Sequence, residues 1–315
     1  MTRDFAPLPP TDEEIAQISL ETLGCFPTEL TTLRSGAWSR AVGFESERGP
    51  MVIRFSATAD DFRADELAAR FASSFLPIPQ VYGIGALGDR YWCISQRMPG
   101  IHLDDLDAQG MVEVLPSLTA MLRSMRDVSA ADTYGYGGWD TKGNGRFAGF
   151  ADQLLEVGVD NPGERGGGWS ENLRQHAHAQ SIFDAGMSSL RELVTFAPDV
   201  RQLIHQDTIN FNVTVANGKI SGIFDWGCAM WGDALYDLAW FRFWNPWYTQ
   251  WASVNIPDQL ERMVGVQGDH AHERMHCYLL HIGIGHIRYN AFTENWSAMT
   301  DVVHATDKVL REIRA

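Results

Sequence analysis

Three polar residues in the second half of the chain have the types and the spacing of a phosphoryl-transfer site. Asp207 stands five residues before Asn212, and Asp225 follows thirteen residues after Asn212. In phosphoryl transfer between a nucleotide and a hydroxyl, one aspartate accepts the hydroxyl proton, while an asparagine and a second aspartate hold the metal that bridges the phosphates. We therefore assign Asp207 as the catalytic base and Asn212 and Asp225 as ligands of Mg²⁺. His205 is the other candidate catalytic residue, and we expect it to brace the loop rather than to move a proton.

A short hairpin is expected to position this set. Two runs of β-forming residues, 213–215 and 220–224, flank the pair Asn217-Gly218, which is a strong signal for a tight β-turn. Asn212 and Asp225 would then lie at the open ends of two paired strands.

The remaining patterns predict two lobes. Before residue 97 the sequence predicts a helix from residue 12 to 23, a second at 60–74, and strands at 31–34, 41–45, 51–55, 81–85 and 91–96. After it, helices are expected at 112–128, 235–243, 258–264, 271–290 and 299–313, with Gly-rich loops at 134–145 and 158–168. We therefore predict an α+β protein with a β-rich lobe at residues 1–97 and a mainly helical lobe at 98–315.

The charge of the chain limits the classes of partner that we expect it to bind. Its 315 residues include 40 acidic and 25 basic side chains, which gives a formal net charge of −15. Nucleic acids and anionic membranes attract basic surfaces, so we expect neither as a partner, whereas a small cationic substrate would be attracted. The sequence does not indicate the oligomeric state.

The cysteines and the N-terminal segment indicate the cellular compartment in which we expect the protein. The four cysteines are too far apart in sequence for a metal site or a disulfide framework, and we expect each to be a buried thiol. They are Cys25, Cys93, Cys228 and Cys277. No apolar run has the length of a signal peptide or of a membrane span. We expect a cytoplasmic protein.

Several motifs in fixed order resemble the aminoglycoside phosphotransferase family, whose members share the protein-kinase fold. The likeness extends from about Leu33 to Tyr248 and is strongest to the branch that acts on hygromycin B. Its motifs are Leu76-Pro77-Ile78-Pro79, Arg97-Met98-Pro99-Gly100, His205-x-Asp207-x4-Asn212, Phe224-Asp225-Trp226, Gly232-Asp233-x3-Asp237-Leu238-Ala239 and Phe243-Trp244-Asn245-Pro246-Trp247. The resemblance implies a bilobed kinase-like fold, ATP or GTP with Mg²⁺ as cofactors, and a cationic aminoglycoside as substrate.

The resemblance also implies a nucleotide site in the first lobe. Ser35, Gly36 and Ser39 would cover the phosphates. Arg54 stands where kinases usually have a lysine for the α- and β-phosphates, as in the hygromycin B branch. Its acidic partner should be Glu66 or Asp65, of which we prefer Glu66. Adenine would meet backbone groups at the strand edge formed by Gln96 and Met98.

The remaining expected roles lie in the second lobe. Asp207 and Asn210 would contact the acceptor, and Trp244 and Trp247 could stack on its sugar rings or belong to the core. For Asp233 and Asp237 we favour capping over metal ligation. Gln206 replaces the small residue common between the histidine and the aspartate of this family, so the backbone conformation of the loop is open.

Two motifs point to other chemistry. The stretch Gly83 to Gly88 has the spacing of a dinucleotide-binding loop, but a β-type run follows it instead of a helix, so we interpret it as a hairpin. His272, Glu273 and His276 match a zinc-peptidase helix, with Glu294 as a distant third ligand. Zinc is the weaker interpretation, because the match stands far from the other chemistry.

Three hypotheses of function remain. The first is a kinase for an aminoglycoside of the hygromycin B type, which would confer antibiotic resistance. The second is a kinase of the same fold for a macrolide, sugar, amino alcohol or other metabolite. The third, motivated by Arg54 and Gln206, is a catalytically silent ligand-binding protein. Retention of Asp207, Asn212 and Asp225 argues against the third.

Overall fold

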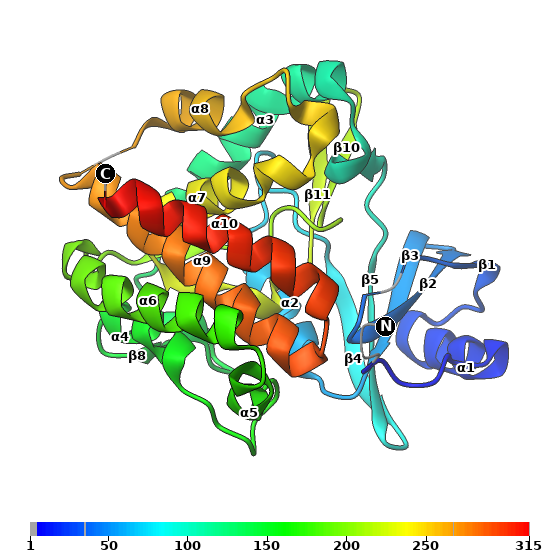
Figure 1. The fold of residues 1–315 in the computed structure, drawn as a ribbon. Helices are drawn as coiled ribbons and strands as arrows, with labels where there is room; N and C mark the ends of the chain where they lie inside the picture. Colours follow the sequence, from blue (N-terminus) through cyan, green and yellow to red (C-terminus); the bar gives the residue numbers. More distant parts are fainter. Residues whose placement is uncertain (1–4, 35, 267, 315) are drawn as a thin grey trace.

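The first lobe is built on a five-stranded antiparallel sheet (Figure 1). The computed structural model describes residues 5–34, 36–266 and 268–314. The strands lie in the order β1-β2-β3-β5-β4. They are β1 (Thr28–Thr32), β2 (Ser39–Ser46), β3 (Gly49–Ser56), β4 (Val81–Leu87) and β5 (Arg90–Gln96). The stretch from Gly83 to Gly88 belongs to β4 and to the turn before β5, as the hairpin interpretation expects.

Two helices accompany this sheet. Helix α1 (Asp12–Leu23) begins with a capping box, in which Thr11 and Glu14 satisfy each other's backbone amides, as the sequence predicts. Its apolar residues Ile15 and Ile18 pack with Phe44 and Ile53 of the sheet in a small core of their own. Helix α2 (Asp60–Ala68) ends earlier than expected and continues as a single 3-10 turn, η1 (Ala69–Phe71).

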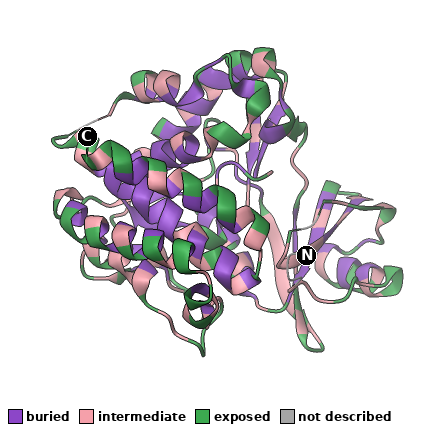
Figure 2. Cartoon of the chain, in the orientation of Figure 1, coloured by how far each residue is buried: buried purple, intermediate pink, exposed green. Residues whose placement is uncertain are grey.

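The second lobe is mainly helical. Its central element is α9 (Ala271–Thr293), which is buried on most of its surface and lies against α5, α6, α7 and α10 (Figure 2). The other helices are α3 (Ala108–Arg126), α4 (Phe150–Leu155), α5 (Trp169–Arg174), α6 (Ala177–Leu193), α7 (Leu235–Trp244), α8 (Ile256–Leu260) and α10 (Trp296–Arg314). The middle of α9, from Cys277 to Ile287, is mostly apolar on all sides, and such a segment is stable only inside a core.

Two small sheets carry the polar loops of this lobe. The first has the order β11-β10-β6 and contains β6 (Ile101–His102), β10 (Val213–Ala216) and β11 (Lys219–Ile223). The second has the order β8-β7-β12-β9 and contains β7 (Tyr136–Trp139), β8 (Gly145–Phe147), β9 (Gln202–Ile204) and β12 (Met230–Gly232). Asn217 and Gly218 both have positive φ, 53° and 69°, so the predicted tight turn joins β10 to β11.

The predicted fold class, α+β with a β-rich and a helical part, is confirmed. The expectation of a plain loop at 134–145 is wrong, because β7 and the first residue of β8 lie in it. Helices α4, α5 and α6 were not predicted, and the first two are only six residues long. None of the described helices combines the length and the apolar character that a membrane-spanning segment needs.

Candidate active site

The catalytic loop, residues 205–212, connects β9 to β10 and carries the candidate base. The amide nitrogen of Asn212 donates to Asp207 Oδ2 at 2.9 Å and to the Asp207 backbone carbonyl at 2.9 Å. The amide nitrogen of Asn210 lies 3.4 Å from the same carboxylate oxygen. Because Asn212 uses its nitrogen on Asp207, its amide oxygen is left to bind a cation.

Three effects raise the pKa of Asp207 well above the ordinary value of an aspartate. The largest is the loss of water around the side chain, followed by the negative charge of Asp225 and, as the smallest, that of Asp104. The hydrogen bonds from Asn210 and Asn212 act in the opposite direction but do not cancel the rise. A carboxylate with a raised pKa is a better acceptor for the proton of a hydroxyl.

His205 is buried and bridges the catalytic loop to the next hairpin. Its Nδ1 accepts a hydrogen bond from the Asp207 amide at 3.2 Å, so Nε2 carries the proton and donates to the Phe224 carbonyl at 3.1 Å. Burial lowers the pKa of His205 to about 4, against a smaller opposing effect of the bond to Phe224. A neutral ring with both nitrogens bonded to backbone fits the expected bracing role.

Asp237 of α7 holds the beginning of the same loop. Its two carboxylate oxygens accept the amides of His205 at 3.0 Å and Gln206 at 2.9 Å. Gln206 has a φ of 67°, a conformation that non-glycine residues rarely adopt. We expected Asp237 to act as a cap, and this expectation is wrong. Asp237 instead holds a distant loop, and its hydrogen bonds impose the backbone conformation at Gln206, which the sequence left open.

Asp233 is also structural. Its carboxylate accepts from Leu235 N at 3.1 Å, as a cap of α7 does, and it is buried against Arg274 at 2.7 Å and the Tyr278 hydroxyl at 2.6 Å. All of its partners are protein groups of the second lobe. Capping is thus supported for this residue and metal ligation is not.

Asp104 holds the other end of the catalytic loop, a role that we did not predict. Its carboxylate accepts the amides of Asn210 at 2.8 Å and Phe211 at 2.9 Å, and the Tyr248 hydroxyl at 2.6 Å. More than a hundred residues separate Asp104 from the loop. Asp104 stands in a short acidic run after a two-residue strand, and this local pattern does not predict such a contact.

Asp225 lies two residues after the end of β11. Its φ is 66°, and its side chain is exposed. The surrounding protein nevertheless removes much of its water, and this raises the pKa of Asp225 to about 6 even though Arg54 opposes the shift. The Asp225 carboxylate and the free Asn212 oxygen are hard donors of the kind that Mg²⁺ prefers, so the residues present fit a magnesium ion.

Arg54 on β3 forms its ion pair with Asp65, so the expected pairing with Glu66 is wrong. Asp65 is buried and Glu66 is exposed on the other face of α2. Burial is the largest single effect and would lower the pKa of Arg54, but the charge of Asp65, with smaller contributions from Cys93, Asp225 and the hydrogen bond to Asp65, raises it above its ordinary value. Asp65 Oδ1 also accepts the Trp226 amide at 2.8 Å, which connects the first lobe to the residue after Asp225.

The phosphate loop, residues 36–39, reaches across to the second lobe, while Ser35 lies outside the described residues. Trp38 stacks on Phe5 with ring centroids 4.4 Å apart, and Phe5 stacks on Phe292 of α9 at 5.1 Å. Arg165 lies 4.2 Å from the Trp38 ring and forms a 2.9 Å ion pair with Asp61. These contacts between the lobes were not predicted.

The expected adenine contact at a strand edge needs correction. Strand β5 lies between β3 and β4, so it has no free edge. The Gln96 amide donates to the Gln80 carbonyl at 2.9 Å, and the Arg97 amide donates to the Pro50 carbonyl at 3.0 Å. Of the two residues expected to contact adenine, Gln96 already uses its amide within the protein. Met98 lies just beyond the sheet, and its backbone remains for a purine.

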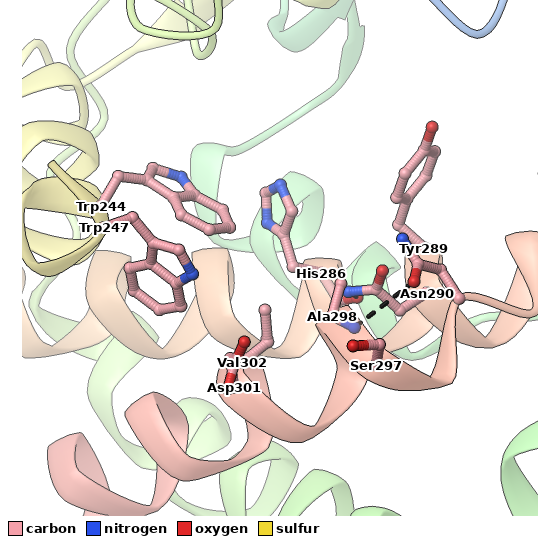
Figure 3. A pocket seen from close by; sticks show the side chains of 10 residues that line it. Trp244, Trp247, His286, Tyr289, Asn290, Ser297, Ala298, Asp301 and Val302 are labelled. Carbon is pink, nitrogen blue, oxygen red and sulfur yellow. Dashed lines mark hydrogen bonds between the residues drawn. The ribbon is translucent and has the colours of Figure 1, made fainter. Parts of the chain in front are cut away.

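Trp244 and Trp247 line a cavity of about 410 Å³ (Figure 3). His286 stands between Trp244 and Tyr289 on one wall, and Asp301 of α10 lies below Trp247. Burial raises the pKa of Tyr289, and the charge of Asp207 makes a smaller contribution in the same direction. Trp244 thus packs against the core as well as lining the cavity, whereas Trp247 is 39% exposed.

The structure also tests the expected burial of the four cysteines and the zinc interpretation. Cys228 is exposed, so the expectation of four buried thiols is wrong. Desolvation raises the pKa of the Cys228 thiol, and the negative charges of Asp207 and Asp225 raise it further. His272 and His276 lie at the first turns of α9, whereas Glu294 caps its opposite end, so the three cannot bind one zinc ion.

Fold and site together define a phosphotransferase with a kinase-like fold, and the comparisons identify the family. Residues 29–276 match the model of the phosphotransferase enzyme family (APH). The chain belongs to this family, as its motifs led us to expect.

Several named proteins and solved structures are similar to this chain. Hygromycin-B 4-O-kinase of Escherichia coli is 31% identical over 230 residues, which are 70% of this chain and 63% of that relative. A thermostable mutant of aminoglycoside phosphotransferase APH(4)-Ia, in a ternary complex with AMP-PNP and hygromycin B, is 27% identical with a TM-score of 0.82, and the match covers 94% of this chain and 98% of that one. The putative fructosamine-3-kinase of Haemophilus somnus, 16% identical with a TM-score of 0.62 over 95% and 96% of the two chains, shares the fold.

Proposed function

We propose that this protein transfers the γ-phosphoryl group of ATP or GTP, with Mg²⁺, to a hydroxyl of an aminoglycoside of the hygromycin B type, and so confers resistance to it. The observation that carries the proposal is the arrangement of Asp207, Asn212 and Asp225. The Asp207 carboxylate is oriented by the Asn212 amide nitrogen at 2.9 Å. The Asn212 amide oxygen and the Asp225 carboxylate remain for a metal.

Each residue has a defined part in this reaction. Asp207 orients the acceptor hydroxyl and receives its proton late, because the transition state of phosphoryl transfer is loose and little proton transfer precedes it. Asn212 and Asp225 would hold Mg²⁺, which when bound neutralises charge on the β- and γ-phosphate oxygens. Arg54, kept charged and oriented by Asp65, supplies a fork of donors for the α- and β-phosphates.

The lobes would divide this work. We propose that residues 1–97 bind the phosphates of the nucleotide through the phosphate loop and Arg54, and that the backbone of Met98, the first residue of the second lobe, meets its base. Residues 98–315 would supply the catalytic loop and the acceptor site. Asp65 connects the two parts, because it bonds both to Arg54 and to the Trp226 amide.

Three features support an aminoglycoside as the acceptor. The net charge of −15 attracts polycations. Trp244 and Trp247 line a cavity of the second lobe, and indole faces stack on sugar rings and attract ammonium groups. The similar structure of APH(4)-Ia contains hygromycin B.

A panel of acceptors tests the proposal. Nucleotide consumption would be followed with Mg²⁺ and hygromycin B, other aminoglycosides, macrolides, sugars and amino alcohols. We expect the highest kcat/KM for hygromycin B, and we expect it to fall as salt screens the attraction between cation and cleft. Turnover of a sugar or macrolide alone would contradict the substrate and leave the kinase, and no turnover with any acceptor would favour a silent binding protein.

A substitution in the cavity wall sharpens this test. Trp247→Ala should raise the KM for hygromycin B by about tenfold, since a stacked aromatic contact contributes on the order of 1 kcal/mol or more. The KM for the nucleotide should stay within twofold. Trp247→Phe is the matched control, because it keeps an aromatic face and should recover most of the affinity.

A further inference from the structure

The end of the catalytic loop has a backbone that its own sequence does not favour. Asn210 and Phe211 have successive positive φ angles of 104° and 65°. Residues other than glycine adopt this region seldom, and a bulky aromatic residue does so only where the surroundings impose it. Something outside the loop must therefore hold these two residues.

Asp104 is the group that holds them. It belongs to the 3-10 turn η2 (Leu103–Asp105), directly after β6, and is only 5% exposed. One carboxylate oxygen accepts the Asn210 amide at 2.8 Å and the other accepts the Phe211 amide at 2.9 Å. Hydrogen bonds to an ionised carboxylate are roughly twice as strong as those between neutral groups, so this pair can impose the strained backbone.

The same carboxylate also bonds to Tyr248, the residue that follows Trp247 of the cavity. The Tyr248 hydroxyl donates to Asp104 Oδ1 at 2.6 Å, and the Gln250 amide nitrogen donates to the Asp104 backbone carbonyl at 3.0 Å. Tyr248 stacks on Trp251 with centroids 4.1 Å apart, and the Trp251 ring nitrogen donates to the Leu106 carbonyl at 2.8 Å.

Tyr248 directly follows Trp247, which lines the cavity. The turns η6 (Asn245–Trp247) and η7 (Thr249–Trp251) are therefore fastened to the segment around Asp104 at several points. A single buried carboxylate thus bonds both to the loop that carries Asp207 and to the segment that carries a wall of the acceptor site.

We propose that Asp104 is a positioning residue that aligns the acceptor site with the catalytic base. It sets the side chains of Asn210 and Asn212 against Asp207 through the backbone of Asn210 and Phe211, and it sets Trp247 through Tyr248. Loss of Asp104 should therefore affect both the chemical step and acceptor binding, whereas loss of the Tyr248 hydroxyl alone should affect acceptor binding. The kinetic form of this inference rests on the proposed function.

The kinetic test compares three variants of the full chain with Mg–ATP and hygromycin B. Asp104→Asn should lower kcat by about tenfold or more and raise the acceptor KM, because a small displacement of reacting groups costs one to two orders of magnitude. Tyr248→Phe should raise the acceptor KM several-fold with kcat within about twofold. The matched control is Asp105→Asn, an exposed neighbour on the same turn, which should leave both values unchanged. In all three, the nucleotide KM should stay within about twofold.

A second measurement does not depend on the reaction. Hydrogen exchange of Asp104→Asn should show faster exchange at Asn210 and Phe211, while His205 and Gln206, which Asp237 holds, keep their protection. If the wild type phosphorylates no acceptor, the proposed function fails and this exchange pattern still decides the positioning role.

Two results would overturn the inference. One is a kcat of Asp104→Asn within twofold of the wild type, with only the melting temperature lowered, since Asp104 would then merely stabilise the fold. The other is unchanged exchange at Asn210 and Phe211 in that variant. An equal rise of the nucleotide KM and the acceptor KM in Tyr248→Phe would likewise contradict the connection to the acceptor site.

Discussion

The catalytic loop and the phosphate loop are held by different interactions. Asp104 and Asp237 each accept two backbone amides of the catalytic loop, at distances of 2.8 to 3.0 Å. The side chain that holds the phosphate loop is Trp38, which stacks on Phe5 and on Phe292 of the other lobe, and the Phe5 amide also donates to the Ala37 carbonyl at 2.9 Å. Charged hydrogen bonds have a narrow range of favourable geometry, whereas apolar stacking tolerates sliding.

This difference matches what the two loops must do. A catalytic base and metal ligands act only within a few tenths of an ångström of their working positions, so directional bonds from buried carboxylates suit them. A segment that covers phosphates must open for nucleotide exchange, and stacked rings can separate without leaving a buried charge unpaired. We therefore infer that the catalytic loop is fixed and that the phosphate loop opens.

The largest effect is expected at the metal ligands of the fixed region. Asp225→Ala should reduce turnover by about a thousandfold or more and weaken Mg-dependent nucleotide binding, because the metal between the phosphates loses a charged ligand. Calorimetry with and without Mg²⁺ would measure the binding. Unchanged Mg–nucleotide affinity together with full activity would show that Asp225 is not a ligand.

The next effect concerns the support of the catalytic loop. Asp237→Ala should lower the free energy of unfolding by about 3 kcal/mol, since it leaves the buried amides of His205 and Gln206 without acceptors. Urea unfolding measures this change. Asp258→Ala, at an exposed carboxylate paired with Arg242, is the control and should cost much less. Equal losses in the two variants would contradict a fixed, carboxylate-held loop.

The phosphate loop should respond differently. Trp38→Ala should raise the nucleotide KM by about fivefold while the free energy of unfolding falls by about 1 kcal/mol, as expected for the loss of stacking contacts between the lobes. Trp38→Phe should preserve most of the affinity because it keeps a ring. A loss of stability as large as that of Asp237→Ala, with the nucleotide KM unchanged, would reverse the comparison between the loops.

The smallest effect is a change in the pH dependence of stability. Burial is the main cause that lowers the pKa of His281 to about 3. The unfolded chain binds this proton below about pH 6.5, and the folded chain does not until about pH 3, so the group's contribution is complete above pH 6.5 and is lost as pH falls.

His281→Gln tests this contribution. Between pH 6 and 4 it should reduce the slope of unfolding free energy against pH by about 1.4 kcal/mol per pH unit. Exposed His304 provides the matched control, and His304→Gln should leave the slope of the wild type unchanged. An unaltered slope in His281→Gln would show that His281 is not buried in the neutral form.

The sequence predicted the part of the site that is local. Asp207, Asn212 and Asp225 lie within nineteen residues around one hairpin, and the turn Asn217-Gly218 fixes its register. Local spacing therefore contained almost all the information that this part of the site needs.

The long-range supports lay beyond such reasoning. Asp104 meets Asn210 across 106 residues, and Trp38 meets Phe292 across the lobes. No spacing within one segment reports contacts of this kind, because they depend on how the helices of the second lobe pack.

The sequence contained a signal against one wrong prediction, the pairing of Arg54 with Glu66. Phe62 and Asp65 stand three residues apart on the buried face of α2, whereas Arg63, Glu66 and Arg70 share its exposed side. A shift of one residue on a helix rotates a side chain by about 100°, so helical periodicity favoured Asp65 as the partner of Arg54.

The role of Asp207 can be measured directly by mass spectrometry of the acceptor. Hygromycin B would be incubated with Mg–ATP and either the wild type or Asp207→Asn, which keeps the size of the side chain and removes its charge. We predict that the wild type adds one phosphoryl group to the antibiotic, and that the variant does so at least about a hundredfold more slowly with equal nucleotide affinity. Phosphorylation by the variant at half the wild-type rate, or ATP consumption by the wild type without a phosphorylated antibiotic, would contradict the assignment of Asp207 as the base for this acceptor.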